Sequence, residues 1–161
     1  MNHPRSAVIG KKGKSVWARS IVYNGRMATK QKAAKGKTTK LNGIVKEFFP
    51  SGKVAAEVPY KNGVRKGAGK MFYESGKLYA TETYDVTLNG PTVTYYDTGV
   101  VQAKLNYKDG LLDGLCQQFY PSGKLESEVT WKAGKRQGVC TVYTEAGAVE
   151  KKVSYKDDKP N

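Results

Sequence analysis

Between residues 41 and 161, apolar and polar side chains alternate with a period of two over several short stretches. In the stretch 54–60, the alternating residues are Val54, Ala56, Val58 and Tyr60 against Ala55, Glu57 and Pro59. Successive side chains of a strand point to opposite faces of a sheet, so this period predicts short strands with one apolar and one solvated face. We expect Val54 to share the apolar face with Ala56, Val58 and Tyr60.

Glycine-containing turn sequences separate these stretches. Pro-Ser-Gly-Lys occurs at 50–53 and 121–124, and Lys-Asn-Gly and Lys-Asp-Gly occur at 61–63 and 108–110. Glycine adopts a positive φ at little cost, as tight hairpin loops require. The turns and the alternating stretches together predict a series of β-hairpins.

These hairpins form a tandem repeat. Five opening glycines stand 24, 23, 24 and 24 residues apart, at Gly43, Gly67, Gly90, Gly114 and Gly138. Each is followed five residues later by an aromatic residue, nine residues later by a second glycine and seventeen residues later by another aromatic residue. The sequence therefore predicts an all-β fold: an elongated antiparallel β-meander of about ten strands, built from tandem β-hairpin repeats of about 24 residues.

Charge divides the chain into two parts. Residues 1–40 hold 11 of the 28 basic residues and no Asp or Glu, whereas residues 41–161 hold the other 17 basic residues and all 14 acidic ones. Such a change in charge pattern marks a boundary between segments. We expect a basic N-terminal arm at 1–40, partly disordered or extended, and a five-repeat β-ribbon domain at 41–161.

The repeat resembles the bacterial MORN-type repeat family in its YwqK-like variant. That pattern has an opening glycine, two adjacent aromatic residues, Gly-Lys, an aliphatic residue, a glutamate, an aromatic residue and a closing glycine, as between Gly114 and Gly134. The glutamate is present at Glu57 and Glu128, but Thr81, Lys104 and Lys152 replace it in the other repeats. The resemblance implies an antitoxin or immunity protein that neutralises a partner toxin. It also implies scaffold or lipid-surface roles, which MORN repeats serve elsewhere.

Residues suited to catalysis or metal binding are scarce. The one histidine, His3, offers neither a nucleophile–histidine system nor a histidine-based metal site. Cys116 and Cys140 occupy equivalent positions of adjacent repeats, two strand spacings or about 9.6 Å apart. A disulfide needs Cα atoms within roughly 7 Å, so we expect two free, half-buried thiols. We therefore predict a protein that is not an enzyme and has no catalytic residue, metal or cofactor.

Two sets of residues are candidates for binding a partner. The first combines the second aromatic residue of each repeat with lysines that line one edge of the ribbon: Phe49, Tyr73, Tyr96, Tyr120, Lys53, Lys77 and Lys124. Aromatic residues are enriched in binding hot spots. Alternatively, these aromatic residues form the core of a thin sheet. This alternative is stronger for the first aromatic residue of each repeat: Phe48, Phe72, Tyr95, Phe119 and Tyr143.

The second set lies in the basic arm. Eleven positive charges without an acid favour contact with a polyanion, and aromatic residues among them permit stacking on exposed nucleotides. The candidate nucleic-acid-binding residues are Lys11, Lys12, Lys14, Trp17, Arg19, Arg26, Lys30, Lys32, Lys35 and Lys37. The alternative is a solvated tail that aids solubility.

We expect a binding protein of the immunity, antitoxin or inhibitor type, which holds another protein, a toxin or effector, on its ribbon face. The alternative is a nucleic-acid-associated structural protein anchored by the arm. Attachment to an anionic membrane and homodimers formed through open sheet edges are further options. Since no apolar stretch has the length of a signal or transmembrane segment, we expect a cytoplasmic protein.

Overall fold

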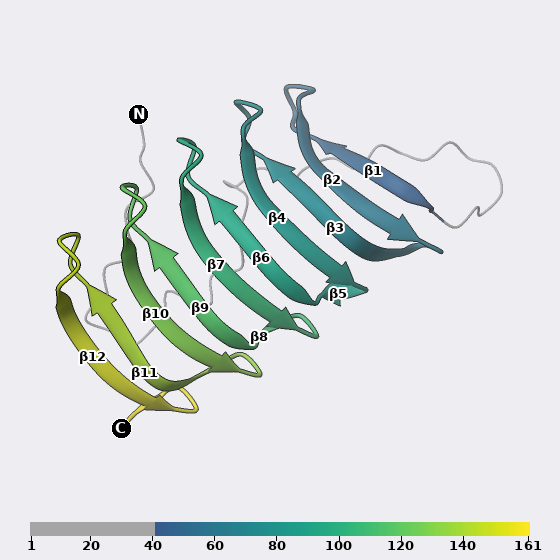
Figure 1. Ribbon diagram of the computed structural model, residues 1–161. Coiled ribbons are helices and arrows are strands. Elements are labelled where there is room, and N and C mark those ends of the chain that lie inside the picture. Colours follow the sequence, from purple (N-terminus) through teal and green to yellow (C-terminus); the bar gives the residue numbers. More distant parts are fainter. Residues whose placement is uncertain (1–40) are drawn as a thin grey trace.

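The computed structural model describes residues 41–161, and they form one open antiparallel sheet (Figure 1). This part of the chain contains thirteen strands and no helix. Eleven strands follow one another across the sheet in the order β1-β2-β3-β4-β6-β7-β9-β10-β11-β12-β13, while β5 pairs with β4 and β8 pairs with β7. The predicted all-β meander of tandem hairpins is confirmed. The basic arm predicted at 1–40 lies outside the described residues.

The strand bounds follow the repeat. The strands are β1 (Gly43–Phe48), β2 (Val54–Lys61), β3 (Val64–Phe72), β4 (Leu78–Asp85), β5 (Thr87–Leu88), β6 (Gly90–Tyr95), β7 (Val101–Lys108), β8 (Leu111–Leu112), β9 (Gly114–Phe119), β10 (Leu125–Lys132), β11 (Lys135–Tyr143), β12 (Val149–Lys156) and β13 (Lys159–Pro160).

At one end of the sheet, which we call the loop end, each repeat closes its hairpin in the same way. The amide of Phe49 donates to the carbonyl of Lys53 at 2.8 Å, and the amide of Gly52 donates to the carbonyl of Phe49 at 2.9 Å. Both bonds recur at the equivalent residues of the other four repeats. Gly52 has a φ of 82°, which confirms the predicted use of glycine in this loop.

At the opposite end, the turn end, two successive residues have positive φ. They are Asn62 and Gly63 in the first repeat, with φ of 53° and 83°. The second repeat is one residue shorter here, which explains its 23-residue spacing, and Val86 takes a φ of 68° instead. The amide of Val86 donates to the carbonyl of Arg65, as that of Gly63 does to the carbonyl of Leu41.

One part of the predicted alternation is wrong. Glu47 pairs with Ala56 whereas its neighbour Phe48 pairs with Val54, so a β-bulge near Ala55 interrupts the register. Paired residues share a face, and Glu47 and Phe48 point to opposite faces. Val54 therefore lies on the face opposite to Ala56. The bulge recurs in each of the other hairpins.

Candidate partner-binding surface

The register assigns the side chains to two faces. On the core face, Val45 pairs with Val58 and Glu47 with Ala56, while on the open face Ile44 pairs with Pro59 and Phe48 with Val54. The other repeats follow the same assignment at equivalent positions. The two faces differ in composition: the core face holds the buried apolar clusters, and the open face holds exposed apolar residues that are available to a partner.

The core face carries the buried apolar clusters. One consists of Cys116, Val129, Trp131 and Cys140, and the other of Ala56, Val58 and Tyr84. Both cysteines are free, as predicted, but they are buried rather than half-buried. Burial raises the pKa of both thiols, which keeps them protonated and unreactive near neutral pH.

The core face also holds one buried carboxylate. Glu82 is 5% exposed and occupies the position that Val58, Leu105 and Val129 fill in other repeats. It accepts a short hydrogen bond from the hydroxyl of Tyr84, whose ring lies 5.4 Å from the guanidinium carbon of Arg65. Burial raises the pKa of Glu82, while Tyr84 and Arg65 act to lower it. Glu82, Tyr84 and Arg65 thus form a polar cluster on the core face.

The open face carries a row of exposed apolar residues, one from each repeat, directly after the opening glycine. Ile44, Leu115 and Val139 are 58%, 47% and 53% exposed. We call the full set the aliphatic row: Ile44, Ala68, Pro91, Leu115 and Val139. All five residues are exposed. Sequence analysis missed this row, although its signal was the apolar residue that follows each opening glycine.

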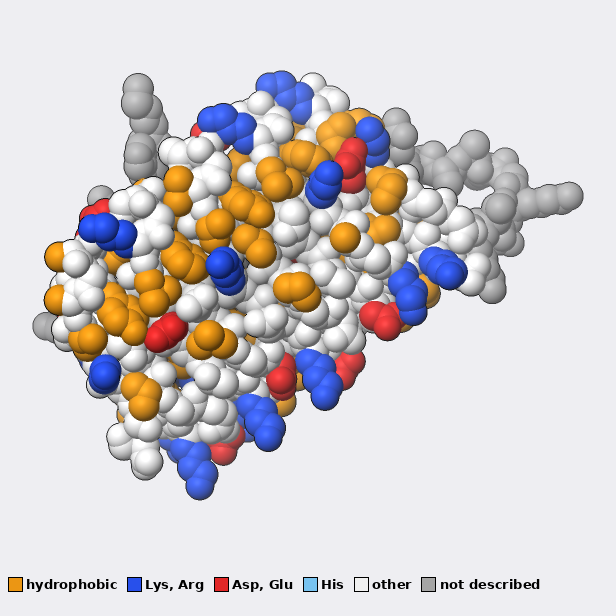
Figure 2. Space-filling view, in the orientation of Figure 1, with side chains coloured by type: hydrophobic (Ala, Val, Ile, Leu, Met, Phe, Trp, Pro, Cys, Tyr) orange, Lys and Arg blue, Asp and Glu red, His pale blue; other side chains and the backbone are white. Residues whose placement is uncertain are grey.

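A second apolar band lies on the open face nearer the loop end. It consists of the first aromatic residues and the aliphatic residues that pair with them: Phe48, Phe72, Tyr95, Phe119, Tyr143, Val54, Leu78, Val101, Leu125 and Val149. All are half-buried except Val149, which is exposed. Neither buried cluster includes any of them. Figure 2 shows hydrophobic side chains gathered over this part of β6 to β12.

Polar side chains lie between the aliphatic row and this aromatic band. Lys46 and Glu57 form an ion pair at 3.3 Å, and the Lys104 ammonium lies 5.5 Å from the centre of the Phe119 ring. Glu128 accepts hydrogen bonds from the Tyr143 hydroxyl at 2.9 Å and the Gln117 amide at 3.3 Å. The open face thus has apolar strips with polar groups beside them, which is typical of protein interfaces.

The predicted partner-binding tyrosines lie at the loop end and join neighbouring repeats. The hydroxyls of Tyr73, Tyr96 and Tyr120 each donate at 2.7 Å to a main-chain carbonyl of the next repeat, at Tyr95, Phe119 and Tyr143 respectively. Burial raises the pKa of Tyr73 to about 12. Phe49 holds the equivalent position in the first repeat but has no hydroxyl. The hydroxyls of the three tyrosines therefore serve the fold, and their partner binding stays a prediction.

The predicted turn lysines are all exposed at the loop end, in the first, second and fourth repeats. Lys77 donates to the carbonyl of Asp97 at 2.8 Å and forms an ion pair with its carboxylate at 3.5 Å, so it too connects adjacent repeats. The structure keeps Lys53 and Lys124 on the same end of the sheet as the tyrosines. Their role in partner binding also stays a prediction.

The remaining predicted site residues, Lys11 to Lys37 of the basic arm, lie outside the described residues. Within 41–161, no group of three or more His, Cys, Asp and Glu side chains is arranged to hold a metal ion. In the same part of the chain, no helix is long and apolar enough to cross a membrane.

The family model for the MORN repeat variant matches the chain five times, at residues 41–62, 65–85, 88–109, 112–133 and 136–157. The chain belongs to this family. Each match spans one hairpin and its connection to the next, so the MORN repeats coincide with the structural repeats. MORN repeats are often binding modules, and MORN repeat proteins are generally non-catalytic.

Comparison with other proteins adds little to this assignment. No curated protein matches the chain. One similar solved structure is the crystal structure of the GtfA/B complex bound to UDP and GlcNAc, with 14% sequence identity and a TM-score of 0.30. The similarity covers 72% of this chain but 23% of that one, so this MORN repeat chain spans less than a quarter of its length. A likeness of this degree carries no argument about function.

Proposed function

We propose that this MORN repeat protein is a non-catalytic module that binds another protein on its open face. The observation that supports the proposal is the exposed aliphatic row, which runs through all five repeats beside a half-buried aromatic band. The aromatic band is contiguous, because apolar residues fill it on all ten strands, whereas polar residues such as Thr130 separate members of the aliphatic row. Contiguous apolar surface is characteristic of interaction sites in water-soluble domains. Polar groups between the two strips supply the hydrogen bonds that fix the orientation of a partner.

The open face is large enough for a specific complex. Ten strands at about 4.8 Å spacing extend about 48 Å, and six residues of strand extend about 20 Å. The product, about 1,000 Å², exceeds the roughly 800 Å² that each partner contributes to a standard interface. A partner that covers most of the five repeats therefore buries enough surface to form a stable complex.

The class of partner that we propose is a toxin or effector, with this chain as its immunity protein, antitoxin or inhibitor. The YwqK-like form of the repeat supports this choice. A stoichiometric inhibitor needs a broad and rigid surface rather than a catalytic cleft. The hydrogen bonds of Tyr73, Tyr96 and Tyr120 connect neighbouring repeats along the loop end of the sheet and restrain their relative motion.

A photo-crosslinking amino acid at Leu115 or Val139 tests the binding face in the source cells. We expect both positions to capture the same protein, and a crosslinker at the loop residue Ser51 to capture it far less. The captured protein is then purified, and its affinity for the full chain is measured by calorimetry. L115E and V139E should each weaken binding at least tenfold, whereas S51E, at an exposed serine of the loop end, should not.

These variants keep the test independent of folding, because all three positions are exposed and their thermal midpoints can be compared. Equal affinity of L115E, V139E and S51E for the captured protein would show that the open face is not the binding surface. If the isolated partner has no toxic or enzymatic activity for the chain to inhibit, the proposal that the chain is an inhibitor is wrong. The proposal that it binds on the open face is not affected.

The second candidate is a nucleic-acid-associated protein anchored by its arm, which the charge of residues 1–40 favours. Such binding is dominated by counterion release, so it should weaken steeply as salt rises and should disappear when 1–40 is removed. Fluorescence anisotropy with a labelled single-stranded oligonucleotide measures both effects. Binding that does not depend on salt would rule this candidate out.

A further inference from the structure

The turn end of the last two repeats places lysines directly opposite lysines. Lys132 pairs with Lys135 across the β10–β11 turn, and Lys156 pairs with Lys159 across the β12–β13 turn. The corresponding pairs of earlier repeats are Lys61 with Val64 and Lys108 with Leu111. Two like-charged pairs in adjacent repeats are therefore specific to this corner of the sheet. We call these four residues the lysine corner.

Like charges directly opposite each other in a sheet destabilise it. All four lysines are exposed, and none takes part in an ion pair among residues 41–161. Three acidic side chains beside these turns bind other groups: Asp113 accepts from the amide of Ala133 at 3.1 Å, Asp157 from Gln137 at 2.7 Å and Asp158 from Arg136 at 2.8 Å. Although burial acts to raise the pKa of Asp158, Arg136 and Lys135 both lower it, so this carboxylate offsets part of the charge of the corner. The four lysines still outnumber the three carboxylates, and an external anion would relieve the remaining repulsion.

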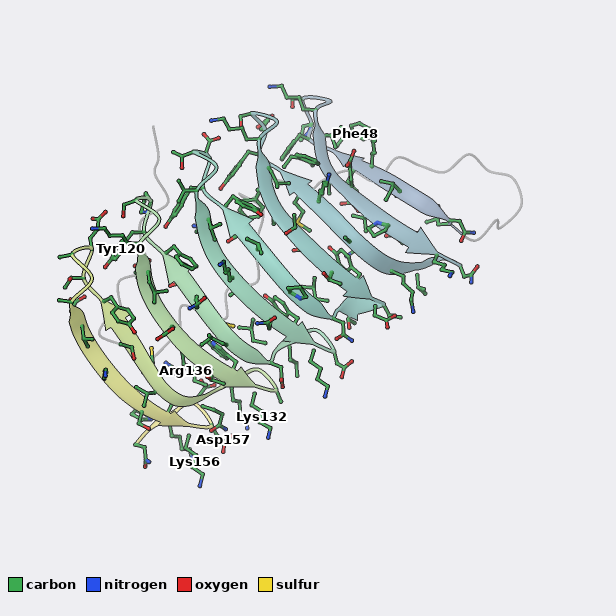
Figure 3. The ribbon with its side chains drawn as sticks, in the orientation of Figure 1. Phe48, Tyr120, Lys132, Arg136, Lys156 and Asp157 are labelled. Atoms are coloured by element: carbon green, nitrogen blue, oxygen red, sulfur yellow. The ribbon has the colours of Figure 1, made fainter. Side chains whose placement is uncertain are left out.

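The lysine corner lies on the open face. Trp131 belongs to the core face and pairs with Arg136, so its neighbour Lys132 and the paired Lys135 point to the open face. The same reasoning from Tyr155 places Lys156 and Lys159 there. In Figure 3, Lys132 and Lys156 lie at adjacent turns of this end. The corner is therefore continuous with the surface that we assign to a partner.

We propose that the lysine corner binds an acidic segment of the protein partner. This inference rests on the proposed function, since it names the chemistry of the partner's contacting residues. The neighbours of the corner on the open face support a protein ligand. Leu115 pairs with Thr130 and Val139 with Ser154, which puts exposed aliphatic residues and hydroxyls directly beside it.

A nucleic-acid strand fits this corner less well. Proteins that bind single strands stack bases on aromatic side chains, and the open-face residues adjoining the corner are Thr130, Gln137 and Ser154, none of them aromatic. The two lysine pairs are two strand spacings apart, about 9.6 Å. An acidic peptide in polyproline II conformation presents every third residue on the same side, about 9.3 Å apart, so two of its carboxylates reach both pairs. Its apolar residues then cover Val139 and Leu115.

Residue-specific NMR titration of the full chain tests the proposal. The probe is a poly-L-glutamate peptide of about 20 residues, and inorganic tripolyphosphate is the comparison at equal charge. We expect the backbone amides of Lys132, Lys135, Lys156 and Lys159 to shift and saturate with the peptide. In K135E/K159E these shifts should be lost, while those of the basic arm remain.

The control is K61E/K108E, which changes the net charge equally at the turn end of earlier repeats, at the positions equivalent to Lys132 and Lys156. In K61E/K108E, the affinity of the corner for the peptide should stay within a factor of two of its value in the original chain. K135E/K159E replaces lysine–lysine pairs by lysine–glutamate pairs, so it should fold at least as stably as the original chain. Its thermal midpoint checks this directly.

Three outcomes would overturn the proposal. They are no saturable shift in the corner, the same loss in K61E/K108E as in K135E/K159E, or tighter binding of tripolyphosphate than of the peptide. The last would identify a phosphate site instead. Failure of the open-face proposal gives a different result: L115E would then leave binding of the captured partner unchanged, whatever the corner does with poly-L-glutamate.

Discussion

The hydroxyl of Tyr96 donates a 2.7 Å hydrogen bond to the main-chain carbonyl of Phe119, in the next repeat along the chain. Tyr73 and Tyr120 make the same bond one repeat earlier and one repeat later. A repeat protein is stabilised mainly by contacts between neighbouring repeats. These bonds fix each hairpin loop to the following strand, and they account for the second aromatic residue of the repeat without reference to a partner.

Replacing Tyr96 by Phe should therefore destabilise the domain while leaving its packing unchanged. We expect a loss of about 1 kcal/mol, the usual net value of a hydrogen bond, and a thermal midpoint lower by about 2–4 °C. Chemical denaturation and a thermal scan measure these values. Y95F is the matched control, since this substitution removes a hydroxyl oxygen from the neighbouring residue, which lies on the open face. Equal losses in both variants would contradict the role of the inter-repeat bond.

The first repeat offers the reverse experiment. Phe49 stands where the three tyrosines stand, so F49Y should add a bond to the carbonyl of Phe72. We expect a gain of about 0.5–1 kcal/mol in the free energy of unfolding. F48Y, on the opposite face of the same hairpin, is the control and should give no comparable gain. A stability for F49Y at or below that of the original chain would show that the loop cannot reach this carbonyl.

Val86 gives a prediction about backbone strain. This β-branched residue has a φ of 68° at the turn end and is 61% exposed, so it gains little from burial to offset the strain. Asn tolerates the left-handed region far better, and V86N should raise the free energy of unfolding by about 1 kcal/mol. Denaturant midpoints measure the change. V64N, at an exposed valine without positive φ, should not stabilise the protein.

The sequence predicted the fold because its strongest signals are local. Glycines such as Gly52 and Gly63 must reach positive φ, and this requirement marks the loop of every repeat and most of the turns between repeats. The side-chain faces were harder to predict, because the β-bulge near Ala55 moves Val54 to the face opposite to Ala56. That shift depends on the register between strands, which no single strand reveals. It also explains why the aliphatic residues that pair with the first aromatic residues, such as Val54 with Phe48, lie on the open face.

The candidate site was predictable only in part. Exposure of the aliphatic row depends on which face receives the core, and residues such as Leu115 and Val129 look alike in the sequence. The lysine corner depends on which residues oppose each other across a turn. Lys132 and Lys135 are separated by two residues in the chain. They pair across the sheet because Ala133 and Gly134 form a two-residue turn.

Glu82 predicts a pH dependence with a definite sign. Burial raises its pKa above that of the unfolded chain, so the native state binds the proton more tightly. The native-state pKa is the higher one, and the free energy of unfolding should therefore fall as the pH rises from the unfolded value, about 4.3, through the native value. E82Q removes this titration but keeps an acceptor for the Tyr84 hydroxyl. Its stability relative to the original chain should increase across that window and then level off.

Denaturant unfolding of both proteins from about pH 4, near the unfolded value, upward measures the difference. E74Q, at an exposed glutamate of the loop end, is the control and should follow the original chain closely. Arg65 and Tyr84 oppose the effect of burial, so the size of the change reports how far they compensate for it. A relative stability of E82Q that falls with rising pH would mean that they overcompensate. Glu82 would then stabilise the core face as an anion.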